Sequence, residues 1–165
     1  MQSLDLEVLA CLKQDGRMSV EDMATCCQAE PKAIAESLDR LKAEQVLIGC
    51  TAVINHRKVP DAKSPIRAFV ELSISPQKSS GYDEIGNRIA KFPNVTAQYL
   101  LSGHYDFLVL VEGASHDEVA GFVFDKLATM EMVNSTTTHF IFKSFKEAGV
   151  VLDAEPPLRR QAVQV

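Results

Sequence analysis

The residues of this sequence that could carry catalysis or hold a metal are its histidines, cysteines and carboxylates. His104 and His139 have no cysteine or glutamate at ligand spacing, so we expect both at a surface or an interface. Four cysteines match no zinc pattern and are expected to be small, buried, apolar side chains: Cys11, Cys26, Cys27 and Cys50. A serine-histidine-aspartate order, a P-loop and an H-E-x-x-H motif are absent from the sequence. We therefore expect no catalytic site, no metal and no cofactor, and predict that the protein is not an enzyme.

A second candidate for chemistry is the short segment Ser102-Gly-His-Tyr-Asp106, which follows one apolar stretch and precedes another. Gly103 permits a positive φ angle, and the Asp106 carboxylate can accept hydrogen bonds from backbone N–H groups. Such a segment is typical of a tight turn, and a turn is one interpretation. The other interpretation is a binding loop, because a lone carboxylate beside exposed backbone N–H groups can hold a polar ligand.

The first third of the chain predicts the elements of a small DNA-binding domain. Apolar residues at helical spacing predict three helices, over residues 4–14, 19–27 and 31–43. Ser19-Val-Glu-Asp22 is a capping box that opens the second helix, and Pro31 suits the first position of the third. Residues 46–54 are β-branched and apolar, which predicts a small β-hairpin. This order is that of a winged helix-turn-helix, which we place at residues 1–55.

The rest of the chain predicts a second domain after a polar linker at residues 56–65. Strand and helix patterns alternate over residues 66–74, 80–92, 95–101, 105–112, 115–130 and 132–145. Strand-helix-strand-strand-helix-strand is the order of a ferredoxin-like βαββαβ domain, placed at residues 66–147, so the predicted fold class is α+β. The run 107–111 is apolar throughout, which indicates a central strand covered by helices on one side and by another subunit on the other. The tail, 148–165, is expected to be flexible or to lie along a partner surface.

Composition sets limits on the partners. The sequence is 46% hydrophobic and 24% charged with a net charge of −5, which argues against non-specific coating of nucleic acid. Neither half is basic: residues 1–58 hold seven Lys and Arg against nine Asp and Glu, and residues 59–165 hold ten against thirteen. No uninterrupted apolar run is longer than 107–111, which is far too short for a membrane span, and the first dozen residues lack the basic charge of a secretory signal. We expect a cytoplasmic protein with no membrane contact.

Several motifs, in order, resemble the Lrp/AsnC (leucine-responsive, or feast-famine) family of transcriptional regulators. Gly-His-Tyr-Asp106 followed by FLVLVEG is similar to the Gly-x-Tyr-Asp signature of the family's effector domain. Gly16-Arg-Met-Ser19 resembles the family's turn into its second helix, and Ile34 to Leu41 followed by Val-Leu-Ile48 resembles its DNA-reading helix and first wing strand. Thr136-Thr-Thr138 before an apolar strand resembles the family's last strand. The resemblance covers about residues 4–147.

The resemblance implies two sites and several partners. The partners are double-stranded DNA, a small-molecule effector that is expected to be an amino acid, and further copies of the chain, as a homodimer that can assemble into tetramers or octamers. The residues expected at DNA are Arg17, Lys32, Glu36, Ser37, Arg40 and Lys42. Those expected at the effector are Ser102, Gly103, His104, Tyr105, Asp106, Thr136, Thr137 and Thr138. Asp106 would accept a bond from the ammonium of a zwitterion, and backbone N–H groups would bind its carboxylate.

Two functions therefore stay open for this sequence. The first is a sequence-specific DNA-binding transcriptional regulator that responds to a small effector. The alternative is an amino-acid-sensing or partner-binding protein of the same fold that no longer binds DNA. Glu36 and Asp39 on the predicted reading helix motivate the alternative, because carboxylates repel phosphate. Some relatives with this two-domain plan are enzymes that act on tetrapyrroles. This sequence lacks the histidine and arginine clusters that we would expect in such an enzyme.

Overall fold

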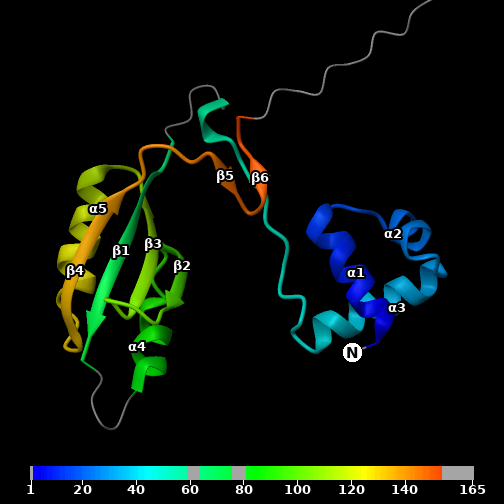
Figure 1. Cartoon of the computed structure of the whole chain (residues 1–165), viewed down its shortest axis with the longest axis horizontal. Coiled ribbons are helices and arrows are strands. Elements are labelled where there is room, and N and C mark those ends of the chain that lie inside the picture. Colours follow the sequence, from blue (N-terminus) through cyan, green and yellow to red (C-terminus); the bar gives the residue numbers. More distant parts are fainter. Residues whose placement is uncertain (1, 59–63, 76–80, 154–165) are drawn as a thin grey trace, which may run out of the picture. The chain divides into compact units, whose positions relative to one another are not determined.

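The computed structural model describes residues 2–58, 64–75 and 81–153 of the chain. The chain divides into two compact units, Met1–Val53 and Ile54–Val165 (Figure 1). The first is a helix-turn-helix and the second is a ferredoxin-like sheet covered by helices, so the predicted α+β fold class is confirmed. Within the described ranges, no helix is long and apolar enough to cross a bilayer.

Unit 1 consists of three helices, α1 (Ser3–Gln14), α2 (Val20–Cys27) and α3 (Pro31–Ala43). The predicted capping box is present, because the Ser19 hydroxyl accepts the backbone N–H of Asp22 at 3.1 Å. Pro31 is the first residue of α3, where its missing N–H costs no hydrogen bond. The helices enclose a small buried core: Val8, Met23, Ala24, Ile34 and Leu41.

The β-hairpin expected over residues 46–54 is not formed, since none of these residues is in a strand. The backbone N–H groups of Val46 and Leu47 both donate to the carbonyl of Leu41, so the segment begins as an extension of the α3 C-terminus. Leu47 packs against the helical core, whereas Ile48 is 82% exposed. A two-stranded hairpin is marginal without a third strand or a packed face, and β-propensity alone does not create either.

Unit 2 contains a four-stranded antiparallel sheet in the order β2-β3-β1-β4. The elements in chain order are β1 (Ile66–Ile74), α4 (Gly81–Ile89), β2 (Val95–Leu100), β3 (Phe107–Gly113), α5 (His116–Phe122), the π-helical turn η2 (Val123–Leu127) and β4 (Val133–Phe140). Helices α4 and α5 contribute to one core with β1 and β3, so both lie on the same face of the sheet (Figure 1). The last predicted helix is thus present, but it ends in a π-helical turn that its periodicity did not indicate.

A small hairpin follows the sheet, formed by β5 (Lys146–Glu147) and β6 (Val150–Val151). Its turn residues, Ala148 and Gly149, both have positive φ, as in the type I′ turns that form the two-residue loops of β-hairpins. The sequence pattern predicts a tail from residue 148 onward and a last strand that ends at residue 145. Instead β4 ends at Phe140 and residues 150–151 pair with 146–147. The rest of the expected tail, from 154, lies outside the described residues.

Candidate functional site

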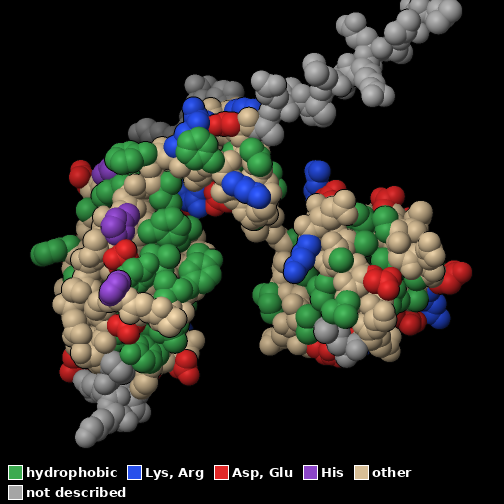
Figure 2. Space-filling view, in the orientation of Figure 1, with side chains coloured by type: hydrophobic (Ala, Val, Ile, Leu, Met, Phe, Trp, Pro, Cys, Tyr) green, Lys and Arg blue, Asp and Glu red, His purple; other side chains and the backbone are tan. Residues whose placement is uncertain are grey.

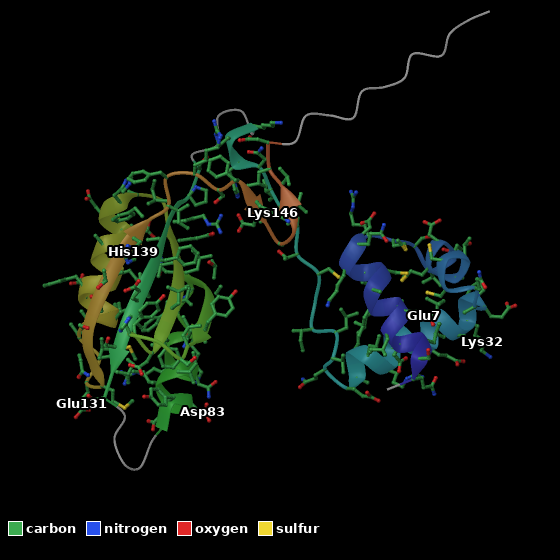
Figure 3. All side chains as sticks on the ribbon, viewed as in Figure 1. Glu7, Lys32, Asp83, Glu131, His139 and Lys146 are labelled. Atoms are coloured by element: carbon green, nitrogen blue, oxygen red, sulfur yellow. The ribbon has the colours of Figure 1, made fainter. Side chains whose placement is uncertain are left out.

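Helix α3 has a core face and an exposed face. Ile34, Ser37 and Leu41 are buried, three and four residues apart, and so mark the core face. The exposed face carries one cation and two acids, Lys32, Glu36 and Asp39 (Lys32 is labelled in Figure 3). Of the remaining residues predicted at DNA, Lys42 lies at the flank of this face and Arg17 in the turn before α2, and both are exposed.

Two of the predicted DNA-contact residues are bound to a buried acid that sequence reasoning missed. Asp5 of α1 is only 1% exposed, and its Oδ1 accepts bonds from the Ser37 hydroxyl at 2.6 Å and from Arg40 Nη2 at 2.5 Å. The other oxygen, Oδ2, accepts the backbone N–H of Gln2 at 2.6 Å. Bonds from Arg40 and Ser37 hold the pKa of the Asp5 carboxyl well below its usual range, and the bond to Asp5 raises the pKa of Arg40.

The DNA-binding prediction for Ser37 is therefore wrong, because its side chain is fully buried and its hydroxyl is turned inward. Arg40 remains partly exposed, but its guanidinium is paired with Asp5 and near Gln2. A sequence signal for this network existed, because Asp5 falls three residues before the buried Val8, on the apolar stripe of α1. A charged residue on a core stripe needs a buried partner.

The predicted effector loop lies between β2 and β3, where Asp106 ties it to neighbouring elements. Asp106 Oδ2 accepts the backbone N–H of Ile74 at 2.7 Å, and Oδ1 accepts the hydroxyl of Tyr82 at 3.1 Å. Its backbone N–H donates to the carbonyl of Leu72 at 2.9 Å. The bond to this carboxylate, together with burial, raises the pKa of Tyr82. Tyr82 belongs to α4, and no motif in the sequence indicated its role.

Ser102, Gly103 and His104 are exposed, whereas Tyr105 and Asp106 are half-buried. Gly103 does not adopt the positive φ that its residue type permits, and a Cβ placed on it would meet no atom of the described residues within 4 Å. The local fold therefore does not require a glycine at this position.

The three threonines of β4 do not share one face of the sheet. Thr136 and Thr138 stand opposite Leu72 and Val70, whose side chains are buried on the helix-covered face, while Thr137 stands opposite Glu71 on the other face. Thr136 lies in the same row of the sheet as Leu72 and Phe107, so it is at the loop's end of the sheet but two strands away from β3. Among the described residues, no hydrogen bond joins these threonines to loop 102–106.

We call the sheet face opposite the helices the open face. It carries apolar side chains, and none of the described residues covers them. Phe69 is 37% exposed and Tyr99 56% exposed, and the partly exposed Leu108 and Leu110 of β3 lie between them. Figure 2 shows hydrophobic side chains crowded over the visible face of unit 2. At the β4 edge, His139 Nε2 lies 3.1 Å from Glu71 Oε1 (His139 is labelled in Figure 3). His139 is thus an exposed surface residue on this face, and His104 lies apart from it in the loop.

The four cysteines are not all buried, contrary to the expectation from the sequence. Cys11 and Cys27 are half-buried, with their sulfurs 3.8 Å apart between α1 and α2, but Cys26 and Cys50 are exposed. Burial raises the pKa of the Cys27 thiol to about 11, so this thiol stays protonated at neutral pH.

These features define a class of protein: a helix-turn-helix unit followed by a ferredoxin-like domain with an exposed loop between β2 and β3. The family model of the Lrp/AsnC ligand binding domain matches residues 67–151. An HTH-type transcriptional regulator of Bacillus subtilis is 37% identical over 149 residues, which cover 90% of this chain and 89% of that protein. The leucine-responsive regulatory protein of Haemophilus influenzae is 22% identical, over 92% of this chain and 90% of its own length.

Solved structures show the same fold. A Neisseria meningitidis transcriptional regulator in complex with L-Met has a TM-score of 0.70 at 20% identity, over 93% of this chain and 97% of that one. The leucine response regulatory protein of Mycobacterium tuberculosis has a TM-score of 0.71 at 24% identity, over 90% and 97% of the two chains. This chain belongs to the Lrp/AsnC family: it is an HTH-type transcriptional regulator with a ligand-binding domain.

Proposed function

We propose that this regulator binds double-stranded DNA through α3, pairs with a second copy through the open face of its sheet, and takes an amino acid at loop 102–106. The observation that carries the effector site is Gly103. Its backbone conformation is open to any residue and no described residue lies within 4 Å of its Cβ position, so the described fold does not explain a glycine there. A ligand that approaches the backbone does explain it, because a side chain at this position would stand in its way.

The chemistry of the loop suits a zwitterion. An ionised carboxylate offers about four lone-pair sites, and among the described residues Ile74 and Tyr82 use two of those of Asp106. The others can accept a ligand ammonium, while exposed backbone N–H groups at residues 102–104 can donate to its carboxylate. The L-Met complex of the Neisseria relative supports an amino acid as the class of effector.

The open face supports a homodimer. A contiguous apolar patch of this kind is unusual on a monomer, and a second copy brings an identical patch related by a two-fold axis. Phe69, Leu108 and Leu110 would form the centre of that interface. Assembly of such dimers into tetramers or octamers belongs to the same proposal.

A dimer presents two copies of α3 to successive major grooves. Of the residues predicted at DNA, Lys32, Lys42 and Arg17 are exposed cations available for phosphates, and Glu36 can accept only from a base donor such as the cytosine amino group. A second candidate function is an amino-acid sensor that does not bind DNA. It is favoured by the pair of acids on the exposed face of α3 and by the pairing of Arg40 with Asp5.

The test is a gel-shift assay on the DNA upstream of the protein's own gene, at about 50 and 200 mM salt, with and without a panel of amino acids. We expect a specific shift that weakens at the higher salt and that one amino acid changes. The double variant Lys32→Ala/Lys42→Ala should lose it, while Lys146→Ala in unit 2 serves as the control. Amino-acid binding without any DNA shift at either salt would favour the second candidate.

A further inference from the structure

Two thiols face one another where α1 packs against α2. The sulfur of Cys11 lies 3.8 Å from the sulfur of Cys27, although the two residues are 16 positions apart in the sequence. Both side chains are half-buried and pack against the core of unit 1, and Figure 3 shows sulfur atoms between the two helices. Cys26, the neighbour of Cys27 on α2, is exposed instead. The fold therefore pairs two particular cysteines out of the four.

The paired sulfurs can form a disulfide with little change in the fold. A disulfide bond is about 2.05 Å long, so the two sulfurs need to approach by about 1.8 Å. Rotation about the χ1 angles of two small side chains provides a movement of this size. The helices themselves are already held together by the buried core that includes Val8, Met23 and Ala24.

The surroundings give the two thiols different properties. Burial and the neighbouring Cys11 thiol raise the pKa of Cys27, and the carboxylate of Glu7 adds to this effect. Cys27 therefore keeps its proton at neutral pH, and its S–H group can donate to a thiolate at Cys11. A thiol that holds its proton beside a second thiol at 3.8 Å is placed to react after that second thiol has been oxidised.

We propose that Cys11 and Cys27 are a modification site, which a hydroperoxide such as hydrogen peroxide converts into a reversible disulfide. The thiolate sulfur of Cys11 attacks one peroxide oxygen and the O–O bond breaks, which leaves a sulfenic acid on Cys11. The departing hydroxide takes up the proton that Cys11 had released and becomes water. The sulfur of Cys27 then attacks the sulfenic sulfur: the S–S bond forms, the S–O bond breaks, and the proton of Cys27 leaves with the hydroxyl group as a second water.

The two thiols thus lose two electrons in total, and one peroxide is reduced to two waters. A thiol reductant reverses the modification by thiol–disulfide exchange. The disulfide closes a loop that contains the turn between α1 and α2, so it restricts the unfolded chain and stabilises unit 1. In a reducing compartment such a bond is transient, which suits a signal rather than a permanent cross-link. This site lies in the helix-turn-helix unit and does not depend on an effector at loop 102–106.

The test uses the full chain with Cys26→Ser and Cys50→Ser combined, which keeps only the two proposed partners. Both replaced cysteines are exposed, so the core of unit 1 is left intact. After treatment with hydrogen peroxide, we expect mass spectrometry to show the loss of two hydrogens and of all reaction with iodoacetamide. Dithiothreitol should restore both. Amide hydrogen exchange in α1 and α2 should slow by at least about tenfold on oxidation, because the cross-link opposes opening.

Cys27→Ser and Cys26→Ser are the matched single variants, because they change neighbouring thiols on the same helix. Cys27→Ser should form no disulfide at Cys11 and should accumulate its sulfenic acid, which dimedone traps. Cys26→Ser should form the disulfide as the wild type does. Circular dichroism of the reduced variants verifies that they are folded.

Three results would overturn the proposal. The first is a double variant that is folded but forms no intramolecular disulfide with peroxide. The second is a wild-type chain in which peptide mapping shows Cys27 linked to Cys26, or two chains linked to each other, instead of Cys11 linked to Cys27. The third is an exchange rate in α1 and α2 that oxidation leaves unchanged or increases.

Discussion

At the scale of single residues, two aspartates hold segments together that are distant in the sequence. Asp5 joins the first turn of α1 to the middle of α3, and Asp106 joins the loop after β2 to the end of β1 and to α4. In both, a carboxylate receives donors from elements that local sequence patterns treat as independent. Neither partner set was predictable from spacing, because a hydrogen bond between positions 5 and 40 depends on how the helices pack.

The Asp5 network makes the stability of unit 1 sensitive to acid. The pKa of Asp5 is lowered from the ordinary value of 3.8, so its stabilising contribution is complete above that value and declines as the pH falls below it, toward the lowered pKa. Asp5→Asn should lower the melting temperature most at pH 7, and the difference from wild type should shrink at pH 3 and below. Thermal unfolding followed by circular dichroism at pH 7, 4 and 3 measures this.

Asp39→Asn is the control for that series, because it removes an exposed acid from α3. It should change the melting temperature little at any of the three pH values. An Asp5→Asn difference that stayed constant between pH 7 and pH 3 would show that the carboxylate charge is not what stabilises the network.

Asp106 is expected to serve both the ligand and the fold. Asp106→Ala should weaken amino-acid binding by about one to two decades, because a charge-assisted hydrogen bond to the ammonium is lost. Dimerisation should survive, since the loop lies outside the open face. Tyr82→Phe is the matched control, because it removes an internal donor to the same carboxylate and leaves the charge. Calorimetry and sedimentation of both variants decide the question: equal losses of affinity would make Asp106 a structural residue only.

At the scale of elements, the two functional hypotheses differ in whether α3 binds DNA. Lys32→Ala should weaken DNA binding and reduce the dependence of log Kd on log salt by about one phosphate contact, whereas Glu36→Gln should strengthen binding by removing a repulsive charge. Binding assays across a salt series measure both effects. If neither change alters binding to any DNA, α3 does not contact phosphates, and the sensor without DNA binding is the better description.

Elements with local signals were predictable, and elements that depend on pairing were not. Ser19 and Pro31 open their helices as expected, and the alternation along β1 gives its buried face correctly. The segment 46–54 has strand composition but no neighbour to pair with, and it stays irregular. Conversely, residues 146–147 pair with residues 150–151 across a turn formed by Ala148 and Gly149. This turn lacks the asparagine-glycine sequence that usually signals a hairpin.

At the scale of the whole molecule, the open face predicts the assembly. Phe69→Asp should convert the protein to monomers at micromolar concentration, because two charges would be buried at the centre of a two-fold interface. Phe124→Asp makes the same change at an exposed phenylalanine of η2, among the helices that cover the opposite face, and should leave the dimer intact. Sedimentation velocity distinguishes them. A wild-type protein that is monomeric, or a Phe69→Asp protein that remains dimeric, would refute the open face as the interface.

The β5–β6 hairpin brings the two ends of the described ligand-binding domain to one corner. Asn55 donates its side-chain N–H to the carbonyl of Leu152, and Arg57 pairs with Asp153. The segment that enters the domain therefore contacts the segment that leaves it. A domain whose two ends lie close together can be inserted into another protein, fused to a different DNA-binding domain, or circularly permuted, because a short linker is enough to join its ends. The modular inheritance of such sensors would then need nothing more than a short connection at this corner.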